Sequence, residues 1–225
     1  IWATGEASAS LGFATARIFD QLDPLERHKD NYFQEQKIEG TRAQLKFLGR
    51  ANKDAMELLE LTDQPEDKRD PARFETLRND PFVQFVMLDS VANVLCPATK
   101  LWNTGYGANM MREAVSLMGG YGITEDCPGF LGYKWMDAQL EATYEGPEAV
   151  QRRQLSVTMT QDLFLAQYRR WIREMRRLAR SNPGTGACTL ASAMEVWLWT
   201  LEHLQKATDA LGERLALGIL ERPER

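Results

Sequence analysis

Apolar residues recur at helical spacing along almost the whole chain. Between residues 40 and 62 they form one stripe: Leu45, Leu48, Ala51, Ala55, Leu58 and Leu59. This spacing of three and four residues is typical of an amphipathic helix. No stretch shows the alternation of period two that a half-buried strand requires, and runs of Val, Ile and Thr are absent. The pattern therefore predicts an all-α protein.

The helical segments are separated by proline and glycine. Helices are expected over residues 5–22, 40–62, 82–96, 98–118 and 148–180. Asp23-Pro24 is expected to end or turn the first helix. Pro97 either kinks one helix or starts a new one. The charged stretch with three prolines before residue 82 is expected to be a loop with one short helical piece.

The C-terminal segment repeats its large residues with a period of seven. They are Leu190, Met194, Trp197, Leu201, Leu204, Thr208, Leu211 and Leu215, spaced alternately by four and three residues. This is a heptad seam with one polar position at Thr208. We expect it to pack on the helix before residue 180, as a hairpin. The hairpin is a candidate module for oligomerisation or docking.

Composition excludes several classes of protein. A net charge of −5 over 225 residues does not favour nucleic acid or an anionic membrane as the main partner. No run of residues approaches 18 apolar positions, so no transmembrane helix is expected. Two histidines and three scattered cysteines do not make a metal site or a disulfide framework. We expect three buried or half-buried thiols in a reducing compartment.

The segment from residue 119 to residue 152 departs from the helical pattern. Gly119, Gly120 and Gly122 allow either a tight helix end or a close approach of the backbone to a ligand. Further on, Glu145 precedes Gly146-Pro147, and proline is favourable in the first turn of a helix. The residues alone favour a helix-start carboxylate, which the helix dipole stabilises by roughly 0.3–1 kcal/mol.

A family resemblance adds a second interpretation of Glu145. The chain resembles the C-terminal helical domain of the acyl-CoA dehydrogenase flavoproteins. The resemblance is carried, in order, by Glu113-Ala114-Val115, Gly119-Gly120-Tyr121-Gly122, Pro128, Asp137-Ala138, Tyr144-Glu145-Gly146 and Gln151-Arg152. It is strong over residues 98–160, while residues 1–97 are similar only in helical texture. It implies an up-and-down four-helix bundle over residues 1–160, with the helical hairpin of residues 161–225 added.

The resemblance implies a reaction. The family oxidises acyl-CoA to 2-enoyl-CoA, with one glutamate taking the α-proton while the β-hydrogen leaves as hydride to FAD. Glu145 matches that glutamate, and Tyr144 and Gly146 match its substrate-binding neighbours. The glutamate backbone N–H and a flavin hydroxyl hold the thioester carbonyl in the family. Burial beside the acyl chain and flavin is expected to raise the pKa of such a base.

The resemblance also implies cofactor contacts. Ser116, Gly119, Gly120 and Pro147 occupy positions where the family contacts FAD. Ser116 replaces a Gln, Pro147 a Thr, Ala149 a Gln and Met136 an Arg of the family pattern.

The partners implied are an acyl-CoA substrate, electron-transfer flavoprotein as electron acceptor, and further copies of the chain in a homodimer or homotetramer. The expected location is the cytoplasm, or the mitochondrial matrix of a eukaryote. The chain starts at Ile1 and shows neither the N-terminal helical domain nor the β-domain of the family. We therefore expect an inactive piece of an acyl-CoA dehydrogenase. The alternative is a non-catalytic helical assembly module with a relict active-site loop.

Overall fold

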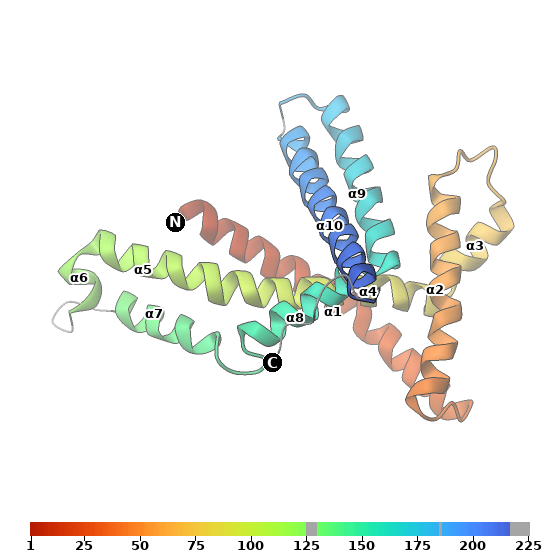
Figure 1. The fold of residues 1–225 in the computed structure, drawn as a ribbon, viewed down its shortest axis with the longest axis horizontal. Helices are drawn as coiled ribbons and strands as arrows, with labels where there is room; N and C mark the ends of the chain where they lie inside the picture. Colours follow the sequence, from red (N-terminus) through yellow and green to blue (C-terminus); the bar gives the residue numbers. More distant parts are fainter. Residues whose placement is uncertain (125–129, 185, 217–225) are drawn as a thin grey trace. The chain divides into compact units, whose positions relative to one another are not determined.

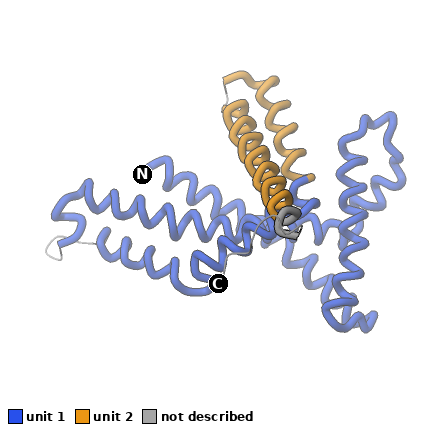
Figure 2. Tube along the Cα trace, viewed as in Figure 1, with its two compact units in different colours: residues 1–165 blue, residues 166–225 orange. Residues whose placement is uncertain are grey.

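The computed structural model describes residues 1–124, 130–184 and 186–216 (Figure 1). Every regular element in these ranges is a helix, which confirms the all-α class. The chain forms two compact units, residues 1–165 and residues 166–225 (Figure 2). Cys127 and Pro128 lie outside the described residues. The up-and-down four-helix order of the first unit stays a prediction.

Helix α1 runs from Trp2 to Glu35 and passes through Pro24. The expectation that Asp23-Pro24 ends or turns this helix is therefore wrong. The reason is tertiary packing, which outweighs the hydrogen bond that proline cannot donate. Beyond Pro24, Tyr32 and Phe33 join Phe47 and Phe82 in a cluster with ring centroids 4.9–5.5 Å apart. This cluster holds the second half of α1 in helical register.

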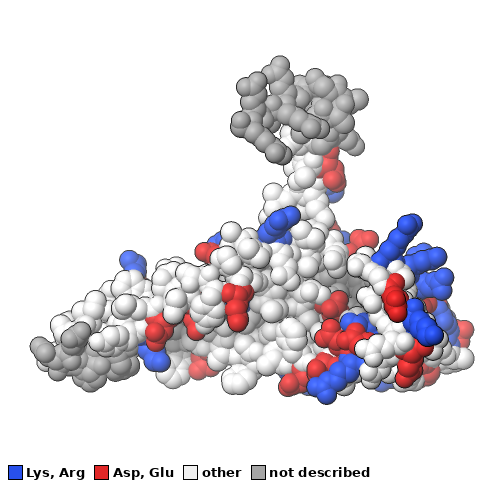
Figure 3. Space-filling view, turned by 90° about the horizontal axis from the view of Figure 1, so that it is seen from below, with Lys and Arg blue, Asp and Glu red and all other residues white. Residues whose placement is uncertain are grey.

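Helices α2 (Thr41–Asp63) and α3 (Pro71–Asn79) form a charged corner. Asp70 caps α3 by accepting from two backbone N–H groups, and Pro71 follows at the first position. Arg73 then donates to Glu57 and to Asp54 on α2, with Nη2 2.9 Å from Asp54 Oδ1. Charged side chains crowd this end of the first unit, whereas the α5–α7 end is largely uncharged on the face in view (Figure 3). The predicted short helical piece is confirmed as α3.

The central helix is continuous through Pro97. Helix α4 (Pro81–Leu101) runs into a π-helical turn, η1 (Trp102–Tyr106), and then into α5 (Gly107–Met118). Pro97 is fully buried and has no N–H for the Asn93 carbonyl one turn earlier. The hydroxyl of Thr158 donates to that carbonyl at 2.9 Å. The defect in α4 thus becomes an attachment point for the helix that carries Thr158.

The central helix is long and apolar enough to span a membrane. Over Pro81–Met118 an 18-residue window reaches a mean hydropathy of 1.4, and 44% of that window is buried inside the protein. Core helices of soluble proteins share these properties. Here α4 packs against α1, α2, α3 and α8. Its contacts are those of a core helix, and the expectation that the chain lacks a transmembrane segment stays a prediction.

Three short helices follow the central helix. They are α6 (Gly120–Ile123), α7 (Phe130–Glu141) and α8 (Glu148–Thr158). Helix α7 was not among the predicted helices, and it packs back along α5. The predicted helix over 148–180 is divided, because turn residues 159–161 separate α8 from α9 (Asp162–Ser181).

The second unit is the predicted helical hairpin of α9 and α10 (Ala187–Ala216). Two ion pairs join the helices, Arg169–Glu202 at 2.9 Å and Arg176–Glu195 at 2.5 Å. The expected heptad seam is split. Met194 and Leu201 are half-buried or buried, whereas Leu190, Leu204 and Leu211 are exposed. The Leu215 side chain lies outside the described residues.

The expectation of covered thiols is wrong for two cysteines. Cys96 and Cys188 are both exposed. Cys188 lies at the start of α10, where the Arg176 guanidinium donates to its sulfur at 3.3 Å.

Candidate functional site

The loop between α7 and α8 has an unusual backbone. Glu145 has a φ of 48°, in the left-handed region that side chains other than glycine rarely adopt. Gly146 follows with a φ of 95°, and a Cβ there would collide with the side chain of Gln151. Pro147 then occupies the N-cap position of α8, without a side-chain capping hydrogen bond. Left-handed backbone at a residue other than glycine costs about 1–3 kcal/mol and is concentrated at functional sites. The strained residue here is the predicted base.

Lys100 anchors this loop from the last turn of α4. Its ammonium group donates to the backbone carbonyl of Tyr144 and, at 3.1 Å, to that of Glu145. These two carbonyls belong to the peptide groups before and after the Cα atom of Glu145, the residue with the left-handed backbone. Lys100 therefore fixes the peptide planes that set the direction of the Glu145 side chain and its N–H group.

Tyr144 is fixed at its other end. Its hydroxyl donates to a carboxylate oxygen of Glu141. This hydrogen bond, with a smaller contribution from burial, raises the pKa of Tyr144 above its ordinary value. Tyr144 is therefore a neutral phenol at physiological pH and holds the loop against the end of α7.

Glu145 itself is open to solvent. Its side chain is exposed, and among the described residues no acceptor takes its backbone N–H. The apolar surroundings expected for the base are not supplied by the described residues. The residue thus presents a carboxylate and a free N–H side by side, two residues before the cap of α8.

Replacing Lys100 with Met should loosen this loop. The change removes two charge-assisted hydrogen bonds but keeps the aliphatic stem. We expect amide hydrogen exchange in residues 141–147 to accelerate roughly tenfold, since about 1–2 kcal/mol of local stability is lost. Lys134→Met, the same change at an exposed position of α7, is the control and should leave the exchange rate unchanged. Equal rates in wild type and Lys100→Met would contradict the anchoring role.

The predicted FAD-contacting residues are not brought together. Ser116, Gly119 and Gly120 lie where α5 turns into α6, and Pro147 lies beyond the opposite end of α7 (Figure 1). Helix α5 alone, with 12 residues, separates the two groups by roughly 18 Å of helical rise. The Ser116 hydroxyl donates to the Arg112 carbonyl of its own helix.

The glycines have structural roles at this corner. Gly119 ends α5 with a φ of 60°. A Cβ on Gly122 would lie 2.8 Å from the Val115 carbonyl oxygen, so Gly122 is needed for close packing on α5. The helix-end interpretation of the glycines therefore holds for Gly119. The contacts of these residues with FAD stay a prediction.

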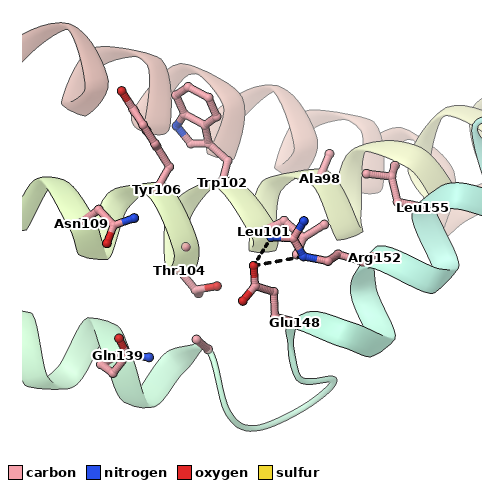
Figure 4. Close-up of a pocket in the computed structure, with 12 residues that line it drawn as sticks. Ala98, Leu101, Trp102, Thr104, Tyr106, Asn109, Gln139, Glu148, Arg152 and Leu155 are labelled. Atoms are coloured by element: carbon pink, nitrogen blue, oxygen red, sulfur yellow. Dashed lines mark hydrogen bonds and ion pairs between the residues drawn. The ribbon is translucent and has the colours of Figure 1, made fainter. Parts of the chain in front are cut away.

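A cleft of about 570 Å³ adjoins the Glu145 loop (Figure 4). It is lined by Ala98, Leu101, Trp102, Thr104, Gly105, Tyr106, Asn109, Gln139, Ala142, Glu148, Arg152 and Leu155. The two ends of the loop, Ala142 and Glu148, belong to the lining, while Glu145 does not. On its α8 side Glu148 is paired with Arg152. Thr104, Asn109 and Gln139 lie across from this pair.

The residues around this cleft were missed by the sequence analysis. One signal was available, because Glu148 and Arg152 are spaced for an ion pair one helical turn apart. Lys100 gave no signal, because its contact with Tyr144 and Glu145 joins positions 44 and 45 residues away. No sequence pattern predicted the π-helical turn η1, although such turns are frequent at functional sites.

Comparison with known protein families finds a match that covers this segment. Residues 86–160 match the family model of the acyl-CoA dehydrogenase C-terminal domain. The resemblance inferred from the sequence is thereby confirmed over a third of the chain. The matched segment contains Lys100, the Tyr144–Pro147 loop and every residue that lines the cleft. Neither the curated proteins nor the solved structures provided a match to the chain.

Proposed function

We propose that the chain supplies the base of an acyl-CoA dehydrogenase, with Glu145 removing the α-proton of an acyl-CoA thioester. The observation that carries this proposal is the conformation of Glu145, whose left-handed backbone sits in a loop anchored by Lys100 inside the matched segment. A strained, anchored and solvent-facing carboxylate is suited to act on a bound molecule rather than to stabilise the fold.

The proposed step uses two groups of one residue. The carboxylate of Glu145 takes the α-hydrogen as a proton, and the electron pair of the broken C–H bond moves into the enolate. The negative charge then develops on the thioester oxygen. The free N–H of Glu145 donates to that oxygen, which lowers the energy of the transition state. Tyr144 and Gly146 shape the approach, Tyr144 through its bond to Glu141 and Gly146 by its lack of a side chain.

FAD is proposed as the hydride acceptor of the complete reaction, with its binding groups mainly outside this chain. Ser116, Gly119 and Gly120 lie before one end of α7 and Pro147 lies beyond the other end. This separation supports our expectation that the 225-residue chain binds no flavin stoichiometrically. Absorbance of the purified chain after incubation with FAD and gel filtration measures this directly. A yellow protein with one flavin per chain would overturn the expectation. We also propose that electron-transfer flavoprotein accepts the electrons and that the protein is located in the cytoplasm or the mitochondrial matrix. Assembly with further copies of the chain is proposed as well.

The non-catalytic alternative is a helical assembly module. It is favoured by the separation of the four predicted FAD-contacting residues and by the exposed apolar residues of α10. The two functions differ in one observable. A full-length polypeptide that exchanges the α-hydrogen of an acyl-CoA with solvent deuterium is an enzyme, whereas an assembly module leaves the thioester unlabelled.

A further inference from the structure

Helix α10 carries two apolar seams. The inner seam is buried or half-buried and consists of Ala191, Met194, Leu198, Leu201 and Gln205. On one flank of this seam, Glu195 and Glu202 form ion pairs with Arg176 and Arg169 of α9. On the other flank, the ring of Trp197 lies 4.5 Å from the ring of Tyr168 on α9, measured between centroids. The inner seam therefore faces α9, which lies beside α10 in Figures 1 and 2.

The outer seam lies next to it on the surface of α10. Its large residues are Leu190, Trp197, Leu204 and Leu211, each seven positions after the last, and the small residues Ala193, Thr200 and Ala207 lie between them. Leu190, Leu204 and Leu211 are 52%, 60% and 51% exposed. The alternation of three and four residues over roughly 33 Å of helix is the pattern of a surface that packs against another helix.

The outer seam is free of charge. The Thr200 hydroxyl donates to the Val196 carbonyl of its own helix, so this threonine can turn its methyl group to an apolar partner. The edge of the seam away from α9 consists of Thr189, Val196, His203 and Ala210, without Asp, Glu, Lys or Arg. On the side of α9, Trp171 is 38% exposed and makes an edge-to-face contact with Tyr168, with the ring centroids 6.3 Å apart. This contact extends the apolar surface onto α9.

This surface is suited to a copy of itself. In a two-fold symmetric contact both partners use the same patch, so the residues of the patch must be complementary to one another. A seam bordered by like charges could not pair with itself, because the charges would repel. Here the ion pairs Arg169–Glu202 and Arg176–Glu195 lie on the opposite flank of the inner seam. A second hairpin can therefore approach without bringing like charges together.

We propose that the outer seam of α10 binds the outer seam of a second copy of this chain. The two hairpins then form a four-helix arrangement in which each α10 packs on its own α9 and on the partner's α10. This inference is independent of the proposed reaction, because it uses only residues 166–216. It stands or falls separately from the role of Glu145.

The test compares two substitutions of exposed apolar residues on α10 by glutamate. Leu204→Glu lies in the outer seam at 60% exposure, and Trp199→Glu lies off it at 59% exposure. Sedimentation velocity of the 225-residue chain from nanomolar to tens of micromolar concentration is expected to show a dimer for wild type and Trp199→Glu. Leu204→Glu should weaken the dimer about 100-fold or more, since it buries two unpaired carboxylates.

Circular dichroism verifies that each variant folds, and Leu211→Glu serves as a second variant in the same seam. A wild-type chain that stays monomeric would overturn the inference, as would equal weakening by Leu204→Glu and Trp199→Glu. Two other occupants would also overturn it. One is residues 1–165 of the same chain, revealed by a lower melting temperature of Leu204→Glu at unchanged monomeric mass. The other is lipid, revealed by binding of a monomeric wild type to phosphatidylserine vesicles that Leu204→Glu abolishes.

Discussion

Glu145→Gln in the full-length polypeptide should reduce exchange of the acyl-CoA α-hydrogen with D2O by about 100- to 10,000-fold. This range is what a positioned general base contributes to proton transfer. Glutamine keeps the size of the side chain, the backbone N–H and the Lys100 anchor, but it cannot accept the proton as a carboxylate does. The measurement is deuterium incorporation at the α-carbon, followed by mass spectrometry of the recovered thioester.

Two further variants make this result specific. Glu145→Asp keeps a carboxylate one methylene shorter, so we expect exchange between that of wild type and that of Glu145→Gln. Glu75→Gln replaces an exposed glutamate on α3, in the charged corner far along the chain, and should exchange like wild type. Exchange that persists at the wild-type rate in Glu145→Gln would show that another group is the base.

Thr158→Val should destabilise the chain by about 1–3 kcal/mol, the cost of leaving a half-buried residue's carbonyl without its donor. The carbonyl is that of Asn93, which Pro97 cannot satisfy and which the Thr158 hydroxyl reaches at 2.9 Å. Valine has nearly the same shape as threonine, so the main change is the lost hydroxyl. Urea unfolding of wild type and variant gives the difference in free energy.

The same measurement is repeated in a chain that also carries Pro97→Ala. Alanine restores the N–H that can donate to the Asn93 carbonyl within α4, so Thr158→Val should cost markedly less in that background. Thr76→Val is the matched control, since the Thr76 hydroxyl donates only to Ala72 of its own exposed helix. An equal cost of Thr158→Val with and without Pro97 would contradict the proposed link between the proline defect and α8.

Local patterns predicted those parts of the fold that depend on near neighbours in sequence. The stripe of α2 placed its helix to within about one residue at each end. The short helical piece expected in the charged stretch before residue 82 is α3. The family resemblance rests on several short motifs in a fixed order over residues 98–160. These residues lie within the segment that matches the family model, residues 86–160.

Contacts between distant residues decided what the sequence analysis missed. Pro24 was expected to end or turn α1, and the aromatic cluster around Phe47 and Phe82 carries the helix past it. Helix α4 continues through Pro97, and the Asn93 carbonyl next to this proline accepts a hydrogen bond from Thr158, 61 positions after Pro97 in the chain. The heptad seam was identified correctly as apolar, yet which of its residues face α9 could not be deduced from spacing alone.

The candidate site shows the same division. Glu145 was predicted to be the base from its motif, but its left-handed backbone and the Lys100 anchor are visible only in the structure. The four residues predicted to contact FAD were grouped by family position. The length of α5 and α7 separates them, a fact that motif order cannot reveal.

A structure of the full-length polypeptide with an unreactive acyl-CoA analogue tests the central claim most directly. We predict a Glu145 carboxylate oxygen about 3–3.5 Å from the α-carbon of the acyl chain, with the Glu145 N–H directed at the thioester oxygen. An acyl chain bound elsewhere, with Glu145 still facing solvent, would contradict the assignment of this residue as the base.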